Sequence, residues 1–146
     1  MAKPEAWRLD AASYPIHHTV NTRFQDLDPN GHLNNVAFAA LFEHGRVRLN
    51  LDIRDWRDRP ADERTMVVVV TINYLGEGHY PDDVIVCTGI GKIGSSSWEI
   101  VQALFQNGRC IATCDSVIAA RKGDGPNPHS PEIREALARI EAKPAI

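Results

Sequence analysis

The sequence contains few cysteines and no strong excess of charge of either sign. Its three cysteines, Cys87, Cys110 and Cys114, are odd in number and have no Cys-x-x-Cys spacing, which argues against a disulfide framework and against a zinc site. The net charge of -3 comes from interspersed acidic and basic residues, so the chain lacks the basic footprint of a nucleic-acid-binding protein. We therefore expect no metal, a reducing cytoplasmic location, and small or acyl ligands.

Long apolar runs are also missing. No apolar stretch approaches the ~20 residues of a membrane helix, and the charged N-terminal segment lacks the apolar core of a signal peptide. The 146 residues, 43% of them apolar, suit one domain with a sizeable core. We predict one domain over residues 1–146, with its core at about 14–122 and with 123–146 as a linker and a C-terminal helix.

Apolar patterning after a polar, proline-containing lead predicts one strand and one long helix. The run from Ile16 to Phe24 alternates imperfectly and is rich in β-branched residues, as strands are. The run from Val36 to Phe42 is apolar without a break, and its paired alanines and the polar residues that follow favour a helix. Such a helix has no exposed face over its first two turns, so we expect it to be central and surrounded by other elements.

Four strand-like runs follow a charged segment at 54–65 that predicts a surface loop. Asn107-Gly108, between the last two runs, is a strong hairpin signal, so these strands should form an antiparallel meander. Ser130 and Pro131 are typical of a helix start, here of a short C-terminal helix. The four runs lie at 66–75, 83–93, 97–106 and 109–121.

These elements predict an α+β fold. Five strands and one buried helix must share a core, and the economical packing is a curved, antiparallel five-stranded sheet wrapped around the central helix, plus the short C-terminal helix. An open sheet of this kind keeps unpaired edges, so we also expect pairing between subunits.

The segment DLDPNGHLNN has two competing interpretations. Asp26, Asp28, Asn30 and Gly31 match positions 1, 3, 5 and 6 of an EF-hand calcium loop. Position 12, where calcium needs a bidentate glutamate, is Ala37, and the residues before the turn alternate like a strand where the motif requires a helix. Both failures argue against calcium.

The same turn, placed before a buried helix, suits catalysis at a carbonyl. The first N–H groups of the helix, around Asn34, Asn35 and Val36, lack helical partners and carry partial positive charge, so they form an oxyanion site for a thioester or ester. Asp28 precedes them on the turn. There it is placed either to attack the carbonyl directly or to activate a water molecule as a general base.

Other residues of the turn support this interpretation or a simpler one. Asn30 and His32 alternate with Asp28 and are candidates to orient the carboxylate or the water, while Gly31 permits a tight turn. In the simpler interpretation Asp28, Asn30 and Gly31 only form the turn and Asn34 only caps the helix. The combination of Asp, Asn and His in one turn directly before an unusually apolar helix favours catalysis.

The stretch FQDLDPNGHLNNVAFAALFEHGR is similar to the signature of the hot-dog fold thioesterases of the 4-hydroxybenzoyl-CoA thioesterase and acyl-CoA thioesterase family, commonly D-x-D-x-x-G followed by an aromatic and an acidic residue. DLDPNGHLNNV is similar also to the catalytic segment D-x-N-x-H-x-N-N of plant acyl-ACP thioesterases. INYLGEGHYPDDVIV, KIGSSSWEIVQAL and NGRCIATCDSVIAA resemble later strands of the same family, so the resemblance covers roughly 16–121. It implies a hot-dog fold.

The resemblance implies catalytic roles for four residues. Asp28 falls where the bacterial family places its nucleophile or base, and Asn30 and His32 fall on the polar pair of the plant enzymes. The backbone N–H near Asn35 falls on the oxyanion donor, and Glu43 matches a commonly acidic helix position, where it would hold the turn or bind water. The plant enzymes join two hot-dog units and use a further downstream acid that has no clear match here.

The resemblance also implies a substrate-binding set. Tyr74 ends a strand and would line the acyl or pantetheine channel, although an aromatic there is more often part of a core. Ser96 and Ser97 lie where the family often has a Gly-x-Ser-Ser strand start, but serines between two strands are more often part of a hairpin turn, and no G-x-S-x-G elbow surrounds them. The full set is Gly31, Asn34, Asn35, Tyr74, Ser96 and Ser97.

The main hypothesis is therefore a cytoplasmic thioesterase that hydrolyses acyl-CoA or acyl-ACP without a metal or cofactor, with a CoA thioester as substrate. The resemblance implies a homodimer or homotetramer with active sites at the subunit interface, and no nucleic-acid or membrane partner. One alternative is a hot-dog hydratase or dehydratase, but its motif places Asp and His five residues apart, whereas Asp28 and His32 are four apart. Another is a non-enzymatic acyl-CoA binding protein, which would not need Asp28.

Overall fold

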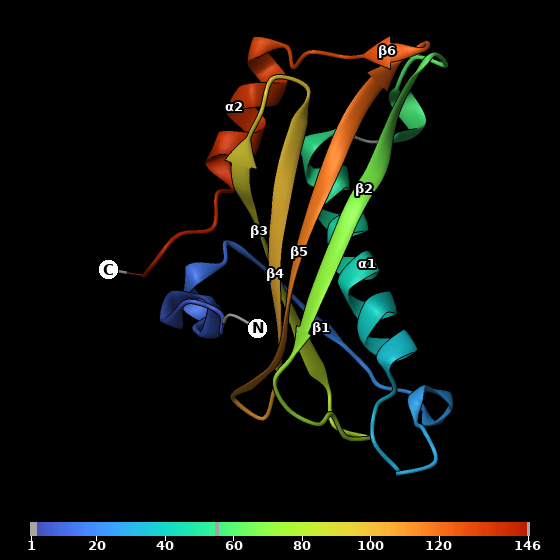
Figure 1. Cartoon of the computed structure of the whole chain (residues 1–146), viewed down its shortest axis with the longest axis vertical. Coiled ribbons are helices and arrows are strands. Elements are labelled where there is room, and N and C mark those ends of the chain that lie inside the picture. Colours follow the sequence, from blue (N-terminus) through green and yellow to red (C-terminus); the bar gives the residue numbers. More distant parts are fainter. Residues whose placement is uncertain (1–2, 55, 146) are drawn as a thin grey trace.

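A long helix, α1, lies in the curve of an antiparallel sheet in the computed structural model, which describes residues 3–54 and 56–145 (Figure 1). The strand order is β1-β3-β4-β5-β2, with a short β6 paired to β5. The predicted curved five-stranded sheet, long helix and C-terminal helix are confirmed. The elements are α1 (Asn35–Ile53), α2 (Pro131–Arg139), β1 (Ile16–Val20), β2 (Glu63–Tyr74), β3 (Val84–Ile93), β4 (Ser97–Gln106), β5 (Arg109–Lys122) and β6 (Gly125–Pro126).

The hairpin between β4 and β5 forms where the sequence predicts it. Gln106 pairs with Arg109, which leaves Asn107 and Gly108 as a two-residue turn. Both have positive φ, 54° and 77°, the backbone conformation that this type of turn requires and that Asn and Gly adopt most readily. The hairpin fixes the register of β4 against β5.

The core between α1 and the sheet is closely packed. Phe42 is fully buried and lies with Val86 and Leu104 in one apolar cluster. A Cβ atom added at Gly45 would lie only 2.5 Å from the Nε2 atom of Gln102, so only glycine lets the helix approach the sheet this closely. The buried face of α1 is thereby fixed on the strands, and with it the position of the first residue of the helix.

The N-terminal segment covers part of the outer face of the sheet. Two 3-10 turns, Ala6–Leu9 and Ala11–Ser13, place Arg8 against the strands, where its guanidinium donates to Asp115 at 2.8 Å and to the hydroxyl of Tyr14 at 2.9 Å. Burial raises the pKa of Tyr14 to about 12. The segment predicted to be a polar lead is therefore a packed part of the fold.

Two predicted boundaries are wrong. The strand predicted over 16–24 ends at Val20, because its partner β3 begins opposite that residue, at Val84. The loop predicted over 54–65 ends early, because β2 begins at Glu63 and pairs from there with the long strand β5.

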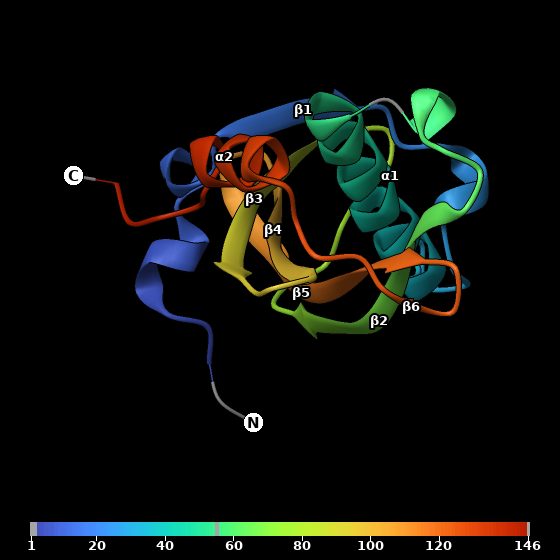
Figure 2. The same ribbon diagram turned by 90° about the horizontal axis from the view of Figure 1, so that it is seen from above.

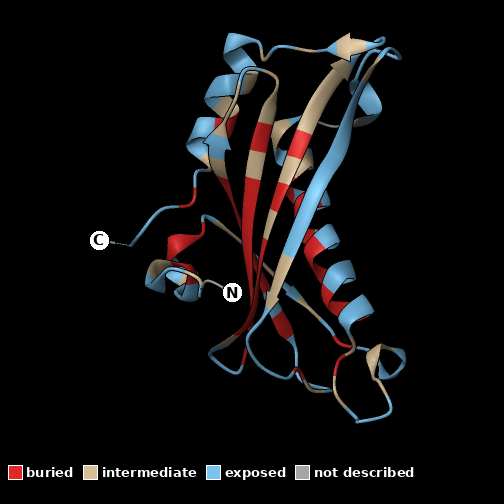
Figure 3. Cartoon of the chain, in the orientation of Figure 1, coloured by how far each residue is buried: buried red, intermediate tan, exposed pale blue. Residues whose placement is uncertain are grey.

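The expectation that other elements surround the first turns of α1 is also wrong for the single chain. Val36 is 70% exposed, and Ala39 and Ala40 are exposed as well. Seen from above, the sheet curls around only part of α1 (Figure 2). Along the edge strand β2 the apolar residues Met66–Val70 are exposed too, with Val68 62% exposed, so this side of the molecule is apolar and open (Figure 3).

Candidate active site

The segment between β1 and α1 folds into a small hairpin-like turn. After the 3-10 turn Phe24–Asp26, Leu27 and Leu33 form an isolated antiparallel bridge. Within it the N–H of Asp28 donates to the carbonyl of His32 at 2.9 Å, and Gly31 adopts a φ of 79° that closes the turn. The turn residue types predicted from the sequence therefore do form a turn.

The carboxylate of Asp28 is held by the backbone of its own turn. Its Oδ1 atom accepts from the N–H of Asn30 at 2.8 Å and from the N–H of His32 at 3.3 Å. The residue is half-buried. Among the residues that the structure describes, the other oxygen, Oδ2, has no hydrogen-bond partner. The carboxylate thus has a fixed orientation and one available oxygen.

The start of α1 follows directly and offers free backbone donors. Asn34 caps the helix, since its Oδ1 accepts from the N–H of Ala37 at 2.7 Å, and its own N–H donates to the carbonyl of Asp26 at 2.8 Å. Within the described chain, the N–H groups of Asn35 and Val36 have no acceptor. Both residues are exposed, so a ligand carbonyl has access to these two donors.

A cluster that the sequence analysis missed lies beside the turn. The Nε2 atom of His32 is 3.3 Å from a carboxylate oxygen of Glu77, and its ring meets that of His79 edge-on at 5.4 Å. The loop that carries Glu77 and His79 is tied to the turn because the N–H of Leu33 donates to the carbonyl of Gly78 at 2.8 Å. The available signal was the short run EGH in the loop before β3, whose closeness to the turn only the fold reveals.

A buried glutamine holds the loop that carries Glu77 and His79 in place. The side chain of Gln106, at the end of β4, accepts from the N–H of His79 and donates to its carbonyl, both at 2.8 Å, and donates to the carbonyl of Asp82 at 3.0 Å. Gly78 is required as well, because a Cβ atom there would lie 2.6 Å from the side chain of Leu33. The position of Glu77 beside His32 is thus determined by packing.

Tyr74 and Glu43, both predicted site residues, lie at different distances from the turn. Tyr74 ends β2 beside the first turn of α1, where its half-exposed ring meets that of Phe38 at 5.2 Å. Glu43 is eight residues into α1, about 12 Å along the helix axis. It is exposed and borders a cavity of about 160 Å³ beside β2, and it makes no hydrogen bond to the turn within the described residues.

Ser96 and Ser97 are not brought to the turn within the chain. They lie in the hairpin between β3 and β4, where the carbonyl of Ser96 accepts from Ala120 and that of Ser97 accepts from Gly94. β3 begins at the end of the sheet near the turn and runs away from it, so this hairpin lies at the opposite end.

Other reactive groups in the described chain do not form a second centre near the turn. Burial raises the pKa of the thiols of Cys87 and Cys114, to about 12 and about 11, so neither is a thiolate nucleophile near neutral pH. No three His, Cys, Asp or Glu side chains among the described residues are grouped to hold a metal ion. Among the described residues, neither α-helix is long and apolar enough to cross a membrane.

Comparison with known proteins agrees with this architecture. Residues 22–137 match the model of a family described as the thioesterase-like superfamily. A thioesterase from Thermus thermophilus, complexed with coenzyme A and Zn, is 30% identical, with a TM-score of 0.79 over 91% of this chain and 98% of its own. A predicted thioesterase from Bacillus stearothermophilus is 27% identical, with a TM-score of 0.79 over 88% and 98% of the two chains. A Pseudomonas aeruginosa protein, 23% identical with a TM-score of 0.82 over 94% and 98%, shares the fold. Comparison with curated proteins finds no match.

Proposed function

The chain belongs to the thioesterase-like superfamily, and from that premise we propose that it is an enzyme that hydrolyses acyl-CoA, or acyl-ACP, to a free acid and a thiol. The observation that supports this most is the juxtaposition of a fixed carboxylate with free backbone donors. Asp28 keeps one oxygen available on the turn, and the unpaired N–H groups of Asn35 and Val36 follow at the start of α1. Coenzyme A bound to the Thermus thermophilus relative supports CoA as the carrier.

In the proposed chemistry the start of α1 stabilises the oxyanion, and Asp28 on the turn acts as nucleophile or general base. The thioester oxygen accepts from the N–H groups of Asn35 and Val36, which stabilise the negative charge that develops on it. In one route Oδ2 of Asp28 bonds to the carbonyl carbon, the C–S bond breaks, the thiolate leaves and takes a proton from solvent, and water hydrolyses the resulting anhydride. In the other route, Asp28 takes a proton from a water molecule as the water oxygen bonds to the carbonyl carbon. The C–S bond then breaks, and the thiolate leaves and takes up a proton from Asp28 or from solvent.

The neighbouring side chains have supporting roles in this proposal. His32, whose Nε2 lies 3.3 Å from a carboxylate oxygen of Glu77, is placed to hold or protonate the departing sulfur or to position water. Asn30 and Gly31 shape the turn around Asp28. Glu43 and Tyr74 line the surface next to β2, where they would contact substrate once that surface is covered.

A homodimer, alone or as half of a tetramer, completes the proposal. β2 pairs only with β5 in the described chain, so its other edge is open, and it exposes the apolar run Met66–Val70. Antiparallel pairing of β2 with its copy would satisfy that edge and cover the apolar surface, including Val36. It would also enclose the turn at a subunit interface, as an acyl site requires.

The proposal is tested with purified protein and a panel of CoA thioesters. The panel runs from acetyl-CoA to palmitoyl-CoA and includes benzoyl-CoA, and thiol release is followed with a thiol reagent. Hydrolysis of at least one member above the spontaneous rate is expected. In a parallel assay with an enoyl-CoA, loss of its absorbance without thiol release would instead indicate a hydratase. Tight binding of a CoA thioester without turnover would indicate a binding protein.

A further inference from the structure

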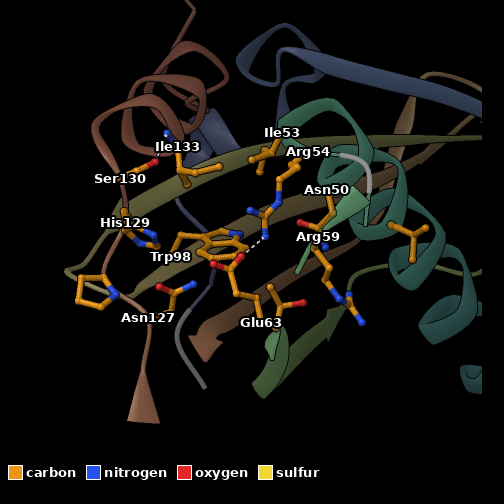
Figure 4. Close-up of a pocket in the computed structure, with 13 residues that line it drawn as sticks. Asn50, Ile53, Arg54, Arg59, Glu63, Trp98, Asn127, His129, Ser130 and Ile133 are labelled. Carbon is orange, nitrogen blue, oxygen red and sulfur yellow. Dashed lines mark hydrogen bonds and ion pairs between the residues drawn. The ribbon is translucent and has the colours of Figure 1, made fainter. Parts of the chain in front are cut away.

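Two arginines face each other at the start of β2. Arg64 on β2 is directly opposite Arg121 on β5 in the antiparallel pairing, and residues in such positions have their side chains on the same face of the sheet, with Cβ atoms about 5 Å apart. Glu63, the neighbour of Arg64, points to α1, where it pairs with Arg54 at 2.8 Å (Figure 4). Because side chains alternate along a strand, Arg64 and Arg121 lie on the outer face of the sheet.

Neither arginine of this pair has a carboxylate partner. Arg64 donates to the carbonyl of Gly123, and Arg121 donates to the carbonyl of Asp124, both at 2.8 Å. Among the described residues, no acidic side chain forms an ion pair with either guanidinium. Like charges directly opposite each other on neighbouring strands destabilise a sheet. An anion bound between the two guanidinium groups would offset this repulsion.

The end of the chain that carries the catalytic turn has the opposite charge. Three exposed carboxylates lie in the loop between β2 and β3, those of Glu77, Asp82 and Asp83. Arg23 at this end is paired with Asp26 at 2.9 Å, and Arg109 is the first residue of β5. The phosphates of coenzyme A are anionic, so the surplus of carboxylates around the turn does not attract them.

The proposed dimer brings the two ends of the chain together. The exposed apolar run of β2 is centred on Val68, and antiparallel pairing of two β2 strands about that residue sets Arg64 opposite the partner's Ile72. Within each chain Tyr74, about 7 Å further along the strand, contacts Phe38 in the first turn of α1. The arginine pair of one subunit thus lies one strand spacing, about 4.8 Å, from the strand that ends beside the other subunit's catalytic turn.

We propose that Arg64 and Arg121 bind the pyrophosphate of a CoA thioester whose carbonyl is held at the catalytic turn of the other subunit. This inference rests on the proposed function and on the β2–β2 dimer. Two guanidinium groups on one face offer forked donors to phosphate oxygens. The pantetheine arm is several strand spacings long, so it spans the path from the turn, around the end of the paired strands, to the outer face. Each active site then combines a carboxylate from one chain with phosphate ligands from the other.

The test compares two thioesters of one acyl group, the CoA thioester and the N-acetylcysteamine thioester, which lacks the phosphates. In the double variant Arg64→Gln with Arg121→Gln, KM for the CoA thioester should rise about tenfold or more at similar kcat, the factor lost with one charge-assisted hydrogen bond. Turnover of the N-acetylcysteamine thioester should stay at wild type, which also shows that the variant folds. Arg109→Gln, at the opposite end of β5, is the matched control and should leave both KM values unchanged.

Mixed dimers show which subunit supplies the arginines. One chain carries Asp28→Asn and the other is the double variant, and two affinity tags isolate the mixed species. The single intact turn then belongs to the chain without the arginines. KM for the CoA thioester should return to the wild-type value, because the intact arginines come from the Asp28→Asn chain. A KM that stays raised would show that the arginines act within their own chain and would overturn the proposal.

Calorimetric titration with free coenzyme A tests the arginines without turnover. Wild type and Asp28→Asn should bind it about tenfold more tightly than the double variant. If this difference is found but no thioester is hydrolysed, the proposed hydrolysis fails and the phosphate site stands. The phosphate site is overturned if wild type binds no coenzyme A, if the double variant binds it equally well, if its KM rises alike for both thioesters, or if Arg109→Gln has the same effect.

Discussion

At the scale of single residues, the same atoms serve structure and the proposed chemistry. Oδ1 of Asp28 organises the turn through Asn30 and His32, which leaves Oδ2 oriented for reaction. Local residue types predicted this turn and the cap at Asn34, because both depend on contacts within a few residues. Glu77 was not predicted, since its contact with His32 depends on how β2 and the following loop return to the turn.

The oxyanion donor can be tested by removing one N–H. Asn35 is the first residue of α1, where proline is tolerated, and Asn34 has ψ of 166°, a conformation compatible with a following proline. Asn35→Pro should lower kcat by about 10²- to 10³-fold with little change in Tm. Asn35→Ala keeps the N–H and should remain close to wild type. Full kcat in Asn35→Pro would refute this donor.

At the scale of elements, α1 shows what sequence patterning can and cannot predict. Its existence and its start follow from the apolar run and Asn34. The environment of the helix could not be predicted in the same way. The apolar run suggested a helix covered on all sides, whereas Val36 is exposed in the single chain. An apolar residue is compatible with burial by its own chain or by a partner, and periodicity does not distinguish the two.

Gly45 provides a prediction for the packing of α1. Helix propensity alone predicts that Gly45→Ala stabilises the protein by up to about 1 kcal/mol. The added Cβ would meet Gln102, Thr88 and Val86 at 2.5 to 2.7 Å, so we expect a destabilisation of about 1–3 kcal/mol instead. Urea denaturation at a fixed protein concentration measures the difference. Equal or greater stability would show that α1 does not pack as described.

At the scale of the whole molecule, an antiparallel meander can be predicted from the sequence, because its hairpin turns and strand lengths depend on residues close together in the chain. The β4–β5 hairpin at Asn107-Gly108 illustrates this. The placement of β2 at an edge, next to β5 rather than β3, required the structure, since no local signal specifies which late strand it joins. That edge is where the proposed active site remains incomplete in a single chain.

The proposed dimer makes a prediction about this edge. Wild-type protein should have the mass of a dimer, or of a tetramer built from dimers, by light scattering after gel filtration. Val68→Lys places a charge in the middle of the exposed run and should give monomers with little thioesterase activity. The control is Ile85→Lys, at an exposed position of the inner strand β3, which should keep the oligomer mass of the wild type. Monomeric wild-type protein that is fully active would contradict the dimer.

The most direct test of the account is thiol release from the best CoA thioester by wild type and by Asp28→Asn. Asparagine keeps an Oδ1 acceptor for the N–H groups of Asn30 and His32, so the turn should persist while the carboxylate is lost. We predict that kcat/KM falls by about 10²- to 10⁴-fold at unchanged Tm, whereas the surface control Asp124→Asn stays at wild type. Unchanged turnover in Asp28→Asn would contradict the central claim.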